Sequence, residues 1–299
     1  AATSDNPPVI GAALHGMYAT YSAHSDSKVQ PDADFIKVVN KHLVSEDPKV
    51  ALRALRAART AITGKSANKE LVDAVVSLKQ KYADGPGRYA LIDTLRVVSF
   101  DSRSEPVISV FVDSLNSKDA YVLSYALQAL HRSTRSVKDT AAVNAKALSL
   151  AKHEDPGVRG RAIELLGTTG KGDPAALAAV LAALEDPHAY VRSEAAESSA
   201  RLRHAPAIHP LMKLVAQKEP NSYEITGFKQ LDGSEGRLRH DGSAWGFVQD
   251  AAMNAVRSLS SGGLKLERLE PKNLAEGLAK NATATQEWYA KNKASFQTK

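Results

Sequence analysis

Histidine and carboxylate side chains are the residues of this 299-residue chain that could hold a metal or carry out acid–base chemistry. His153-Glu154 is the one His-Glu pair in the sequence, and His240-Asp241 supplies only two ligands. A metal centre needs several ligands that converge on one point. The spacing therefore predicts neither a metal site nor another cofactor.

Nucleophilic chemistry is also poorly represented. The chain has no cysteine, which excludes disulfides, thiolate zinc sites and iron–sulfur clusters. No G-x-S-x-G stretch marks a nucleophilic serine, and the glycines follow no strand–turn–helix phosphate pattern. We therefore expect the chain not to be an enzyme.

Residues suited to recognition gather in one segment, 222–245, where aromatic and cationic side chains alternate with glycine. Interface hot spots favour such aromatics together with arginine. The alternative is a hairpin that folds back over the last repeat, with its tryptophan buried at the start of the resumed helix. The candidate binding residues of the insertion are Tyr223, Phe228, Lys229, Arg237, Arg239 and Trp245.

An internal repeat positions these residues. An aspartate recurs before each apolar stretch, at intervals of 37, 35, 36 and 31 residues. Aspartate caps a helix by accepting its free backbone N–H groups, and the proline that often follows suits the first helical position. The aspartates are Asp47, Asp84, Asp119, Asp155 and Asp186.

Each repeat reads as two helices joined by this aspartate turn. In the fourth, Val158, Ala162 and Leu166 fall on one broad face of the second helix, which Gly167 is expected to end. One such pair cannot bury its apolar stripe alone, so pairs stack. We predict an all-α, right-handed α-solenoid of about six helical hairpins, with a small β-hairpin or loop inserted in the sixth.

The sequence pattern of the repeats resembles that of the HEAT family, in particular the HEAT-like type first described in phycobilin lyases. The earlier repeats depart from its D-P-x-V-R-x-x-A-A-x-A-L-G pattern, since Ala51 and Leu123 replace the arginine. The resemblance implies a helical scaffold and covers roughly residues 32–260. The matching residues are Asp155, Pro156, Val158, Arg159, Ala162, Leu165, Leu166 and Gly167, then Asp186, Pro187, Val191, Arg192, Ala195 and Ala196.

The organisation that follows has three parts. Residues 1–31 form an N-terminal segment that can hold a cap helix, and 32–260 form the repeat solenoid with its insertion at 222–244. Residues 261–299 form a C-terminal capping helix.

The chain begins "AATSDNPPVIG", a small-residue, polar, Pro-containing start that is typical of what remains after a signal peptide is removed. The stretch from Trp288 resembles the tails of exported bacterial HEAT-repeat proteins. We therefore expect a periplasmic or secreted protein. No apolar run reaches the roughly 20 residues that a membrane helix needs.

The second helix of each repeat has an apolar residue, usually valine, near its start. If the second helices line the concave face, the positions three and six or seven residues after this one point outward. The charge of this face changes from basic near the N-terminus to acidic at Glu194 and Glu197. The alternative is a solvated face of i,i+3 and i,i+4 charge pairs. Arg159 and Arg192 are expected to pair with turn aspartates. The predicted binding residues of this face are Arg53, Arg56, Arg96, Tyr125, Gln128 and Arg161.

The predicted function is a non-catalytic protein–protein interaction scaffold or complex subunit whose partner is another, unidentified protein. One alternative is a basic solenoid that binds nucleic acid or another polyanion, since residues 41–146 hold 17 basic against 11 acidic side chains. Both tryptophans lie in the last fifth of the chain, which disfavours a nucleic-acid cleft. The other alternative is an enzyme accessory or lyase-like protein with a cleft at Asp93, Arg96, Tyr125 and Arg161. The oligomeric state is not predicted.

Overall fold

Helices dominate the computed structural model, which describes residues 6–23, 32–63, 68–98, 104–242 and 245–296. These residues form 14 α-helices and one two-stranded sheet. The chain divides into two compact units. The first unit comprises Ala1–Lys138 and Thr226–Arg237, and the second comprises Asp139–Ile225 and Leu238–Lys299.

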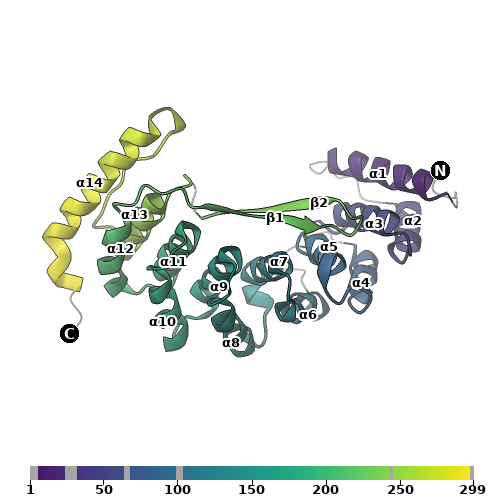
Figure 1. Ribbon diagram of the computed structural model, residues 1–299, viewed down its shortest axis with the longest axis horizontal. Helices are drawn as coiled ribbons and strands as arrows, with labels where there is room; N and C mark the ends of the chain where they lie inside the picture. The colour runs from purple at the N-terminus through teal and green to yellow at the C-terminus, as the bar shows by residue number, and fades with distance from the viewer. Residues whose placement is uncertain (1–5, 24–31, 64–67, 99–103, 243–244, 297–299) are drawn as a thin grey trace. The chain divides into compact units, whose positions relative to one another are not determined.

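The first unit is built from stacked helix pairs (Figure 1). Helix α2 packs on α3, α4 on α5 and α6 on α7, while α3, α5 and α7 form a second row of contacts and α1 packs against α3. The helices are α1 Pro7–Ala23, α2 Ala33–Leu43, α3 Pro48–Ala61, α4 Lys69–Ser77, α5 Gly85–Leu95, α6 Glu105–Asp113 and α7 Ala120–His131, with 3₁₀ turns η2 Ser114–Asn116 and η3 Thr134–Ser136.

The second unit repeats this plan. Helix α8 packs on α9, α10 on α11 and α12 on α13; α9, α11 and α13 follow one another in a row, and α14 packs on α13. The helices are α8 Thr140–Leu150, α9 Pro156–Thr169, α10 Pro174–Ala183, α11 Ala189–Arg201, α12 Ile208–Leu214, α13 Val248–Leu259 and α14 Leu274–Asn292, with 3₁₀ turns η4 Ala205–Ala207, η5 Pro271–Asn273 and η6 Lys293–Phe296.

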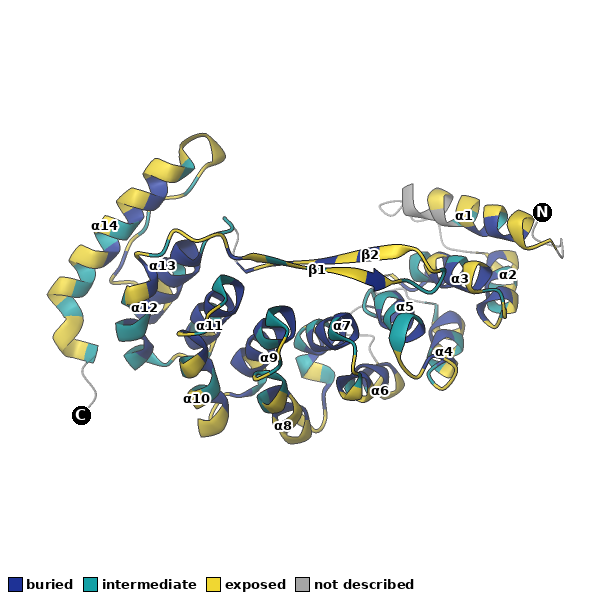
Figure 2. Cartoon of the chain, viewed as in Figure 1, coloured by how far each residue is buried: buried dark blue, intermediate teal, exposed yellow. Residues whose placement is uncertain are grey.

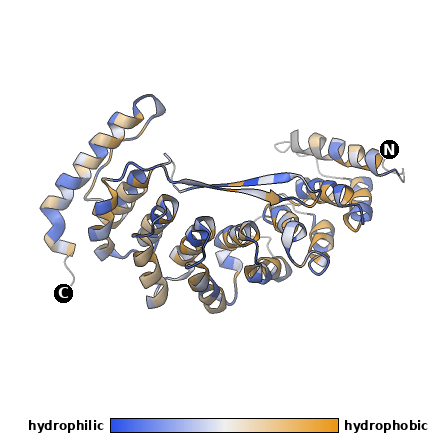
Figure 3. Ribbon diagram, viewed as in Figure 1, coloured by the Kyte–Doolittle hydropathy of each residue, from blue (hydrophilic) through white to orange (hydrophobic). Residues whose placement is uncertain are grey.

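Paired helices in which successive pairs stack on one another are the arrangement of an α-solenoid, so the predicted fold class is confirmed. Within each unit the buried residues follow the contacts between helices (Figure 2). Hydrophilic residues predominate on the sides that face away from those contacts (Figure 3). In the part of the chain that the structure describes, no helix is both long enough and apolar enough to cross a bilayer.

The turn aspartates act as helix caps in some repeats. Asp47 accepts from the backbone N–H groups of Lys49 and Val50, and Asp155 accepts from that of Val158. Asp186 does not cap: the turn is longer by one residue, so His188 is the N-cap of α11 and Asp186 accepts from the His188 N–H at 2.8 Å. The prediction of one capping role for every turn aspartate was therefore wrong.

Gly167 does not end its helix, because α9 continues to Thr169. Its lack of a side chain serves packing instead. A Cβ atom at this position would lie 2.4 Å from the Ser198 hydroxyl oxygen and 2.8 Å from the Ser198 Cα of α11. Glycine therefore allows α9 and α11 to approach closely.

Arg159 links one repeat to the next, as predicted. Its Nε and Nη2 atoms donate to the two carboxylate oxygens of Asp186, each at 2.9 Å. Arg192 differs from its prediction. Its guanidinium binds the backbone carbonyls of the 186–187 turn and the side chains of Gln217 and Glu219, and not an aspartate carboxylate.

Candidate functional site on the hairpin and the second helices

The insertion folds as a β-hairpin with strands β1 Ser222–Lys229 and β2 Glu235–Asp241, which confirms the hairpin form of the prediction (Figure 1). Burial alternates along β2: Gly236, Leu238 and His240 are buried, and the residues between them are exposed. One face of this strand is therefore covered by protein and the opposite face meets solvent.

In the first unit, Phe228 of the hairpin enters an aromatic cluster. Its ring stacks on Tyr121 with centroids 4.4 Å apart and meets Tyr89 edge-on at 5.1 Å. Tyr89 in turn packs edge-on against Tyr125 at 4.7 Å, and the Arg96 guanidinium lies 5.2 Å from the Tyr125 ring centroid. Burial raises the pKa of Tyr121 to about 12, so its hydroxyl stays neutral.

Gly236 makes room for this cluster. A Cβ atom there would lie 2.4 Å from the Cζ atom of Phe228, closer than real contacts allow. The aromatic ring of β1 therefore lies across the glycine of β2, an arrangement that covers the bare backbone of a strand glycine.

One arginine of the first unit bonds the hairpin directly, and two others pair with a carboxylate beside the aromatic cluster. Arg56 of α3 is exposed and donates from Nη2 to the Gln230 side-chain oxygen at 3.0 Å. Arg59 and Arg96 share one carboxylate, with distances of 3.0 Å and 2.8 Å to the two oxygens of Asp93. Two cations on one carboxylate leave a local positive charge.

The hairpin residues of the first unit add further charge. Lys229 pairs with Glu235 at 2.9 Å, and both are exposed, as is Arg237. Arg53 is half-buried beside α1. We name this region the tip surface; its cations are Arg53, Arg56, Arg59, Arg96, Lys229 and Arg237, and its carboxylates are Asp93, Asp232 and Glu235.

In the second unit, the other part of the hairpin binds α9 and the turn before α11. The Tyr223 hydroxyl donates to a carboxylate oxygen of Asp155 at 2.8 Å, and its ring lies edge-on to His188 at 4.9 Å. Burial, together with the bond to Asp155, raises the pKa of Tyr223 to about 12. The cap of α9 thus also anchors β1.

Beside this anchor lies a buried charged network. The Nε–H of Arg161 donates to Nδ1 of His240 at 3.1 Å, while its Nη1 atom lies 2.7 Å from Glu164 and 3.9 Å from Glu194. Burial, together with the charge of Arg161, lowers the pKa of His240 to about 3. Burial also holds the pKa of the Glu194 carboxyl well above its usual range. His240 is therefore neutral and accepts the bond.

These contacts correct the prediction that the second-helix positions point outward. Tyr125 and Arg161 are buried, with 9% and 8% exposure, whereas Arg53, Arg96 and Gln128 are half-buried. Arg161 is buried because His240 of the hairpin packs on it and accepts its hydrogen bond. The role of these residues in binding a partner stays a prediction.

The predicted residues of the insertion separate into two groups. Tyr223 and Phe228 are intramolecular anchors, and Phe228 is too buried, at 7% exposure, to meet a partner directly. Lys229, Arg237 and Arg239 are exposed, and Arg239 pairs with Asp241 at 2.9 Å. Trp245 lies after the hairpin and before α13, half-buried rather than buried. Residues 243–244 of the predicted insertion lie outside the described part of the chain.

Sequence reasoning missed Tyr121 and Tyr190, on which the hairpin rings Phe228 and His240 stack. A signal was present: Ala-Tyr-Val occurs at 120–122 and again at 189–191, at the start of α7 and of α11. An aromatic residue repeated on the same helix position, where the solenoid core does not need it, indicates a residue that receives a further element.

No group of three or more histidine or carboxylate residues that could hold a metal ion occurs among the residues described. The histidine of the buried network contacts an arginine, which would repel a cation. The arrangement supports binding through fixed side chains.

Residues 144–224 match the family model described as HEAT repeats. A search of curated protein sequences found no match. Among solved structures, one engineered protein is 20% identical over 87% of this chain and 94% of its own, with a TM-score of 0.40. A second engineered protein is 16% identical over 96% of this chain and 79% of its own, with a TM-score of 0.47.

The N-terminal domain of Mot1, solved in complex with TBP, is 15% identical over 86% of this chain and 35% of its own, with a TM-score of 0.49. The family match covers the two turns that carry Asp155 and Asp186. Residues 144–224 are therefore similar to HEAT repeats, and the helix pairs of both units stack as in an α-solenoid.

Proposed function

We propose that this protein is a non-catalytic HEAT-repeat scaffold that binds an acidic surface of another protein through the tip surface of its first unit. HEAT repeats generally mediate protein interactions. The observation that carries the proposal is charge: Arg56, Lys229 and Arg237 are exposed on the tip surface, and Arg59 and Arg96 share the single carboxylate of Asp93. Complementary charge steers a partner and fixes its orientation.

The state of the aromatic side chains favours a protein over a nucleic acid. Single-stranded nucleic acid binds where free aromatic rings stack on bases. Here the rings of Tyr89, Tyr121, Tyr125 and Phe228 are engaged with one another. The exposed arginines remain available for charge-assisted hydrogen bonds to carboxylates.

The test is crosslinking in the source cells, followed by purification with and without nuclease. The variant Arg56→Glu/Arg237→Glu reverses two exposed cations of the tip surface. The control Lys265→Glu/Lys291→Glu makes the same change in net charge at exposed sites of the second unit. We expect one acidic partner to be recovered equally with the wild type and the control, and about tenfold less with the tip variant.

Equal recovery with all three proteins would place the binding surface elsewhere. Loss of all recovered material after nuclease treatment would overturn the proposal in favour of a polyanion ligand, and a steep decrease of heparin retention with salt would then be expected.

A further inference from the structure

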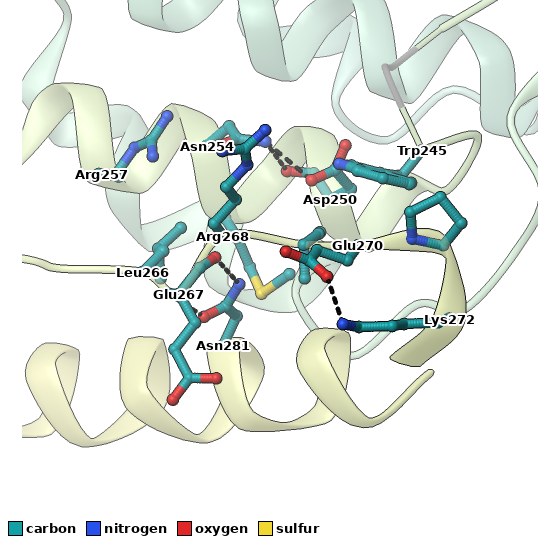
Figure 4. A pocket seen from close by; sticks show the side chains of 13 residues that line it. Trp245, Asp250, Asn254, Arg257, Leu266, Glu267, Arg268, Glu270, Lys272 and Asn281 are labelled. Atoms are coloured by element: carbon teal, nitrogen blue, oxygen red, sulfur yellow. Dashed lines mark hydrogen bonds and ion pairs between the residues drawn. The ribbon is translucent and has the colours of Figure 1, made fainter. Parts of the chain in front are cut away.

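A second site lies in the second unit, in a cavity of about 690 Å³ between α13, the segment 260–273 and α14 (Figure 4). Ligand-binding clefts commonly measure about 300–1,000 Å³. The hairpin contributes no residue to this cavity, so it is separate from the tip surface.

One helix face forms the first wall. Asp250, Met253, Asn254 and Arg257 follow the i, i+3, i+4, i+7 spacing of one side of α13. The Asn254 side-chain amide donates to Asp250 at 2.8 Å, and Met253 is buried. The wall therefore presents a buried thioether and a fixed polar pair.

An extended segment forms the second wall and is held in place by Asn281. This buried side chain of α14 donates to the backbone oxygen of Glu267 at 3.0 Å and accepts from its N–H at 2.7 Å. The Asn281 side chain therefore satisfies both the N–H and the C=O group of Glu267, as the backbone of a neighbouring strand would. The cavity is consequently preformed, which reduces the entropic cost of binding.

The two ends of the cavity differ in chemistry. Trp245 lies toward one end, and Arg257 and Arg268 lie toward the other (Figure 4). Trp245 is half-buried, so part of its indole is open to a ligand. The first end suits a hydrophobic side chain.

The second end carries two exposed arginines without a carboxylate. Among the described residues neither Arg257 nor Arg268 forms an ion pair. Three carboxylates of the described part of the chain line the cavity, and none lies within ion-pair distance of either arginine: Glu270 lies 3.1 Å from Lys272, Asp250 accepts from the Asn254 amide at 2.8 Å, and Glu267 is exposed. Two unpaired guanidinium groups favour a carboxylate ligand.

We propose that this cavity binds an extended peptide segment, with a hydrophobic side chain against Trp245 and a carboxylate between Arg257 and Arg268. A cleft walled by one helix and one extended segment matches the elongated form of a peptide. The carboxylate comes from an acidic side chain or from a peptide C-terminus. This site is independent of the binding surface proposed for the first unit.

The test uses Trp245 fluorescence in a Trp288→Phe background, because the chain has only two tryptophans. The probes are blocked peptides in which alanines separate one Phe from one Glu, a matched Gln series, and Phe-terminated peptides with a free or amidated C-terminus. We expect saturable changes with the Glu series or the free-acid peptides, and about tenfold weaker binding of their neutral counterparts.

Arg257→Gln and Arg268→Gln should each weaken binding of the acidic peptide about tenfold and leave the melting temperature unchanged, since both side chains are exposed. The control Lys213→Gln removes an exposed charge outside the cavity and should bind normally. Equal binding of acidic and neutral peptides, or no fluorescence response in either series, would overturn the proposal without affecting the one for the first unit.

Discussion

Arg161 donates a hydrogen bond from Nε to Nδ1 of His240 over 3.1 Å, so a buried cation depends on a neutral imidazole. Protonation of His240 would remove the acceptor and place a second positive charge against the first. The rings of Tyr190 and Tyr223 and the backbone of Gly157 also lie beside the imidazole, and Glu164 binds the Nη1 atom of the guanidinium. The bond that holds β2 to α9 is therefore sensitive to acid.

The first prediction concerns pH. The pKa of His240 is about 3 in the folded protein and about 6.5 for an ordinary histidine, so the unfolded chain takes up the proton first as pH falls. The contribution of His240 to the free energy of unfolding should be complete above pH 6.5 and decrease toward pH 3 by about 1.4 kcal/mol per pH unit. Urea denaturation at a series of pH values measures this slope.

His240→Gln is the matched control, because glutamine accepts the Arg161 bond but does not titrate. The buried Glu194 has a raised pKa and acts in the opposite direction, since its contribution to stability is present at low pH and lost as pH rises. It is present in both proteins and cancels in the difference. If the free energy of unfolding changed with pH by the same amount in both proteins, His240 would not be the group responsible.

The second prediction concerns Phe228. Truncation to alanine removes a buried ring stacked on Tyr121, and we expect the free energy of unfolding to decrease by about 3 kcal/mol. A double-mutant cycle with Tyr121→Leu should give a coupling energy of about 1 kcal/mol. Additive effects of the two substitutions would show that the stacking makes no specific contribution.

The third prediction concerns Gly236. Alanine at this position places its Cβ atom 2.4 Å from the Phe228 ring, so the ring or the strand must move. We expect a loss of about 1–3 kcal/mol in thermal or chemical denaturation. Phe228→Leu in the same chain should make the Gly236→Ala substitution less costly, whereas an unchanged cost would mean that strand geometry rather than the ring requires glycine.

The fourth prediction concerns Arg159, which binds Asp186 with two nitrogens and the carbonyls of 153–154 with a third. Lysine cannot reproduce this planar set of bonds, so Arg159→Lys should destabilise the protein by about 1–3 kcal/mol. The control Arg201→Lys alters a more exposed i,i+4 pair with Glu197 and should change the stability by less than about 0.5 kcal/mol. Equal effects would show that the link between repeats contributes little.

The repeated helices were predictable from the sequence because their signals are local. A capping aspartate, a following proline and an apolar stripe all act within one turn or one helix, as Asp155 and Pro156 do at the start of α9. Arg159 could be placed for the same reason, since its partner Asp186 occupies the next copy of the same turn.

The sequence did not predict that the hairpin covers part of the second helices, because this packing depends on contacts between residues far apart in the chain. Nothing near Arg161 indicates that a histidine 79 residues later will bury it. The alternation of β2 showed which residues share a strand face, but not which helices that face would meet. The same limit applies to Trp245, whose cavity is completed by the segment after α13.

The Arg56–Gln230 bond joins residues separated by 174 positions, within a repeat array whose other contacts are largely between neighbours. During synthesis the helices that carry Arg56 and Tyr121 leave the ribosome long before the strand that carries Phe228. Local repeats form rapidly, whereas closure of so long a loop is slow. Folding of this protein therefore has a late step, and until the hairpin is made the tyrosines of α5 and α7 are left uncovered for a chaperone or a premature partner to meet.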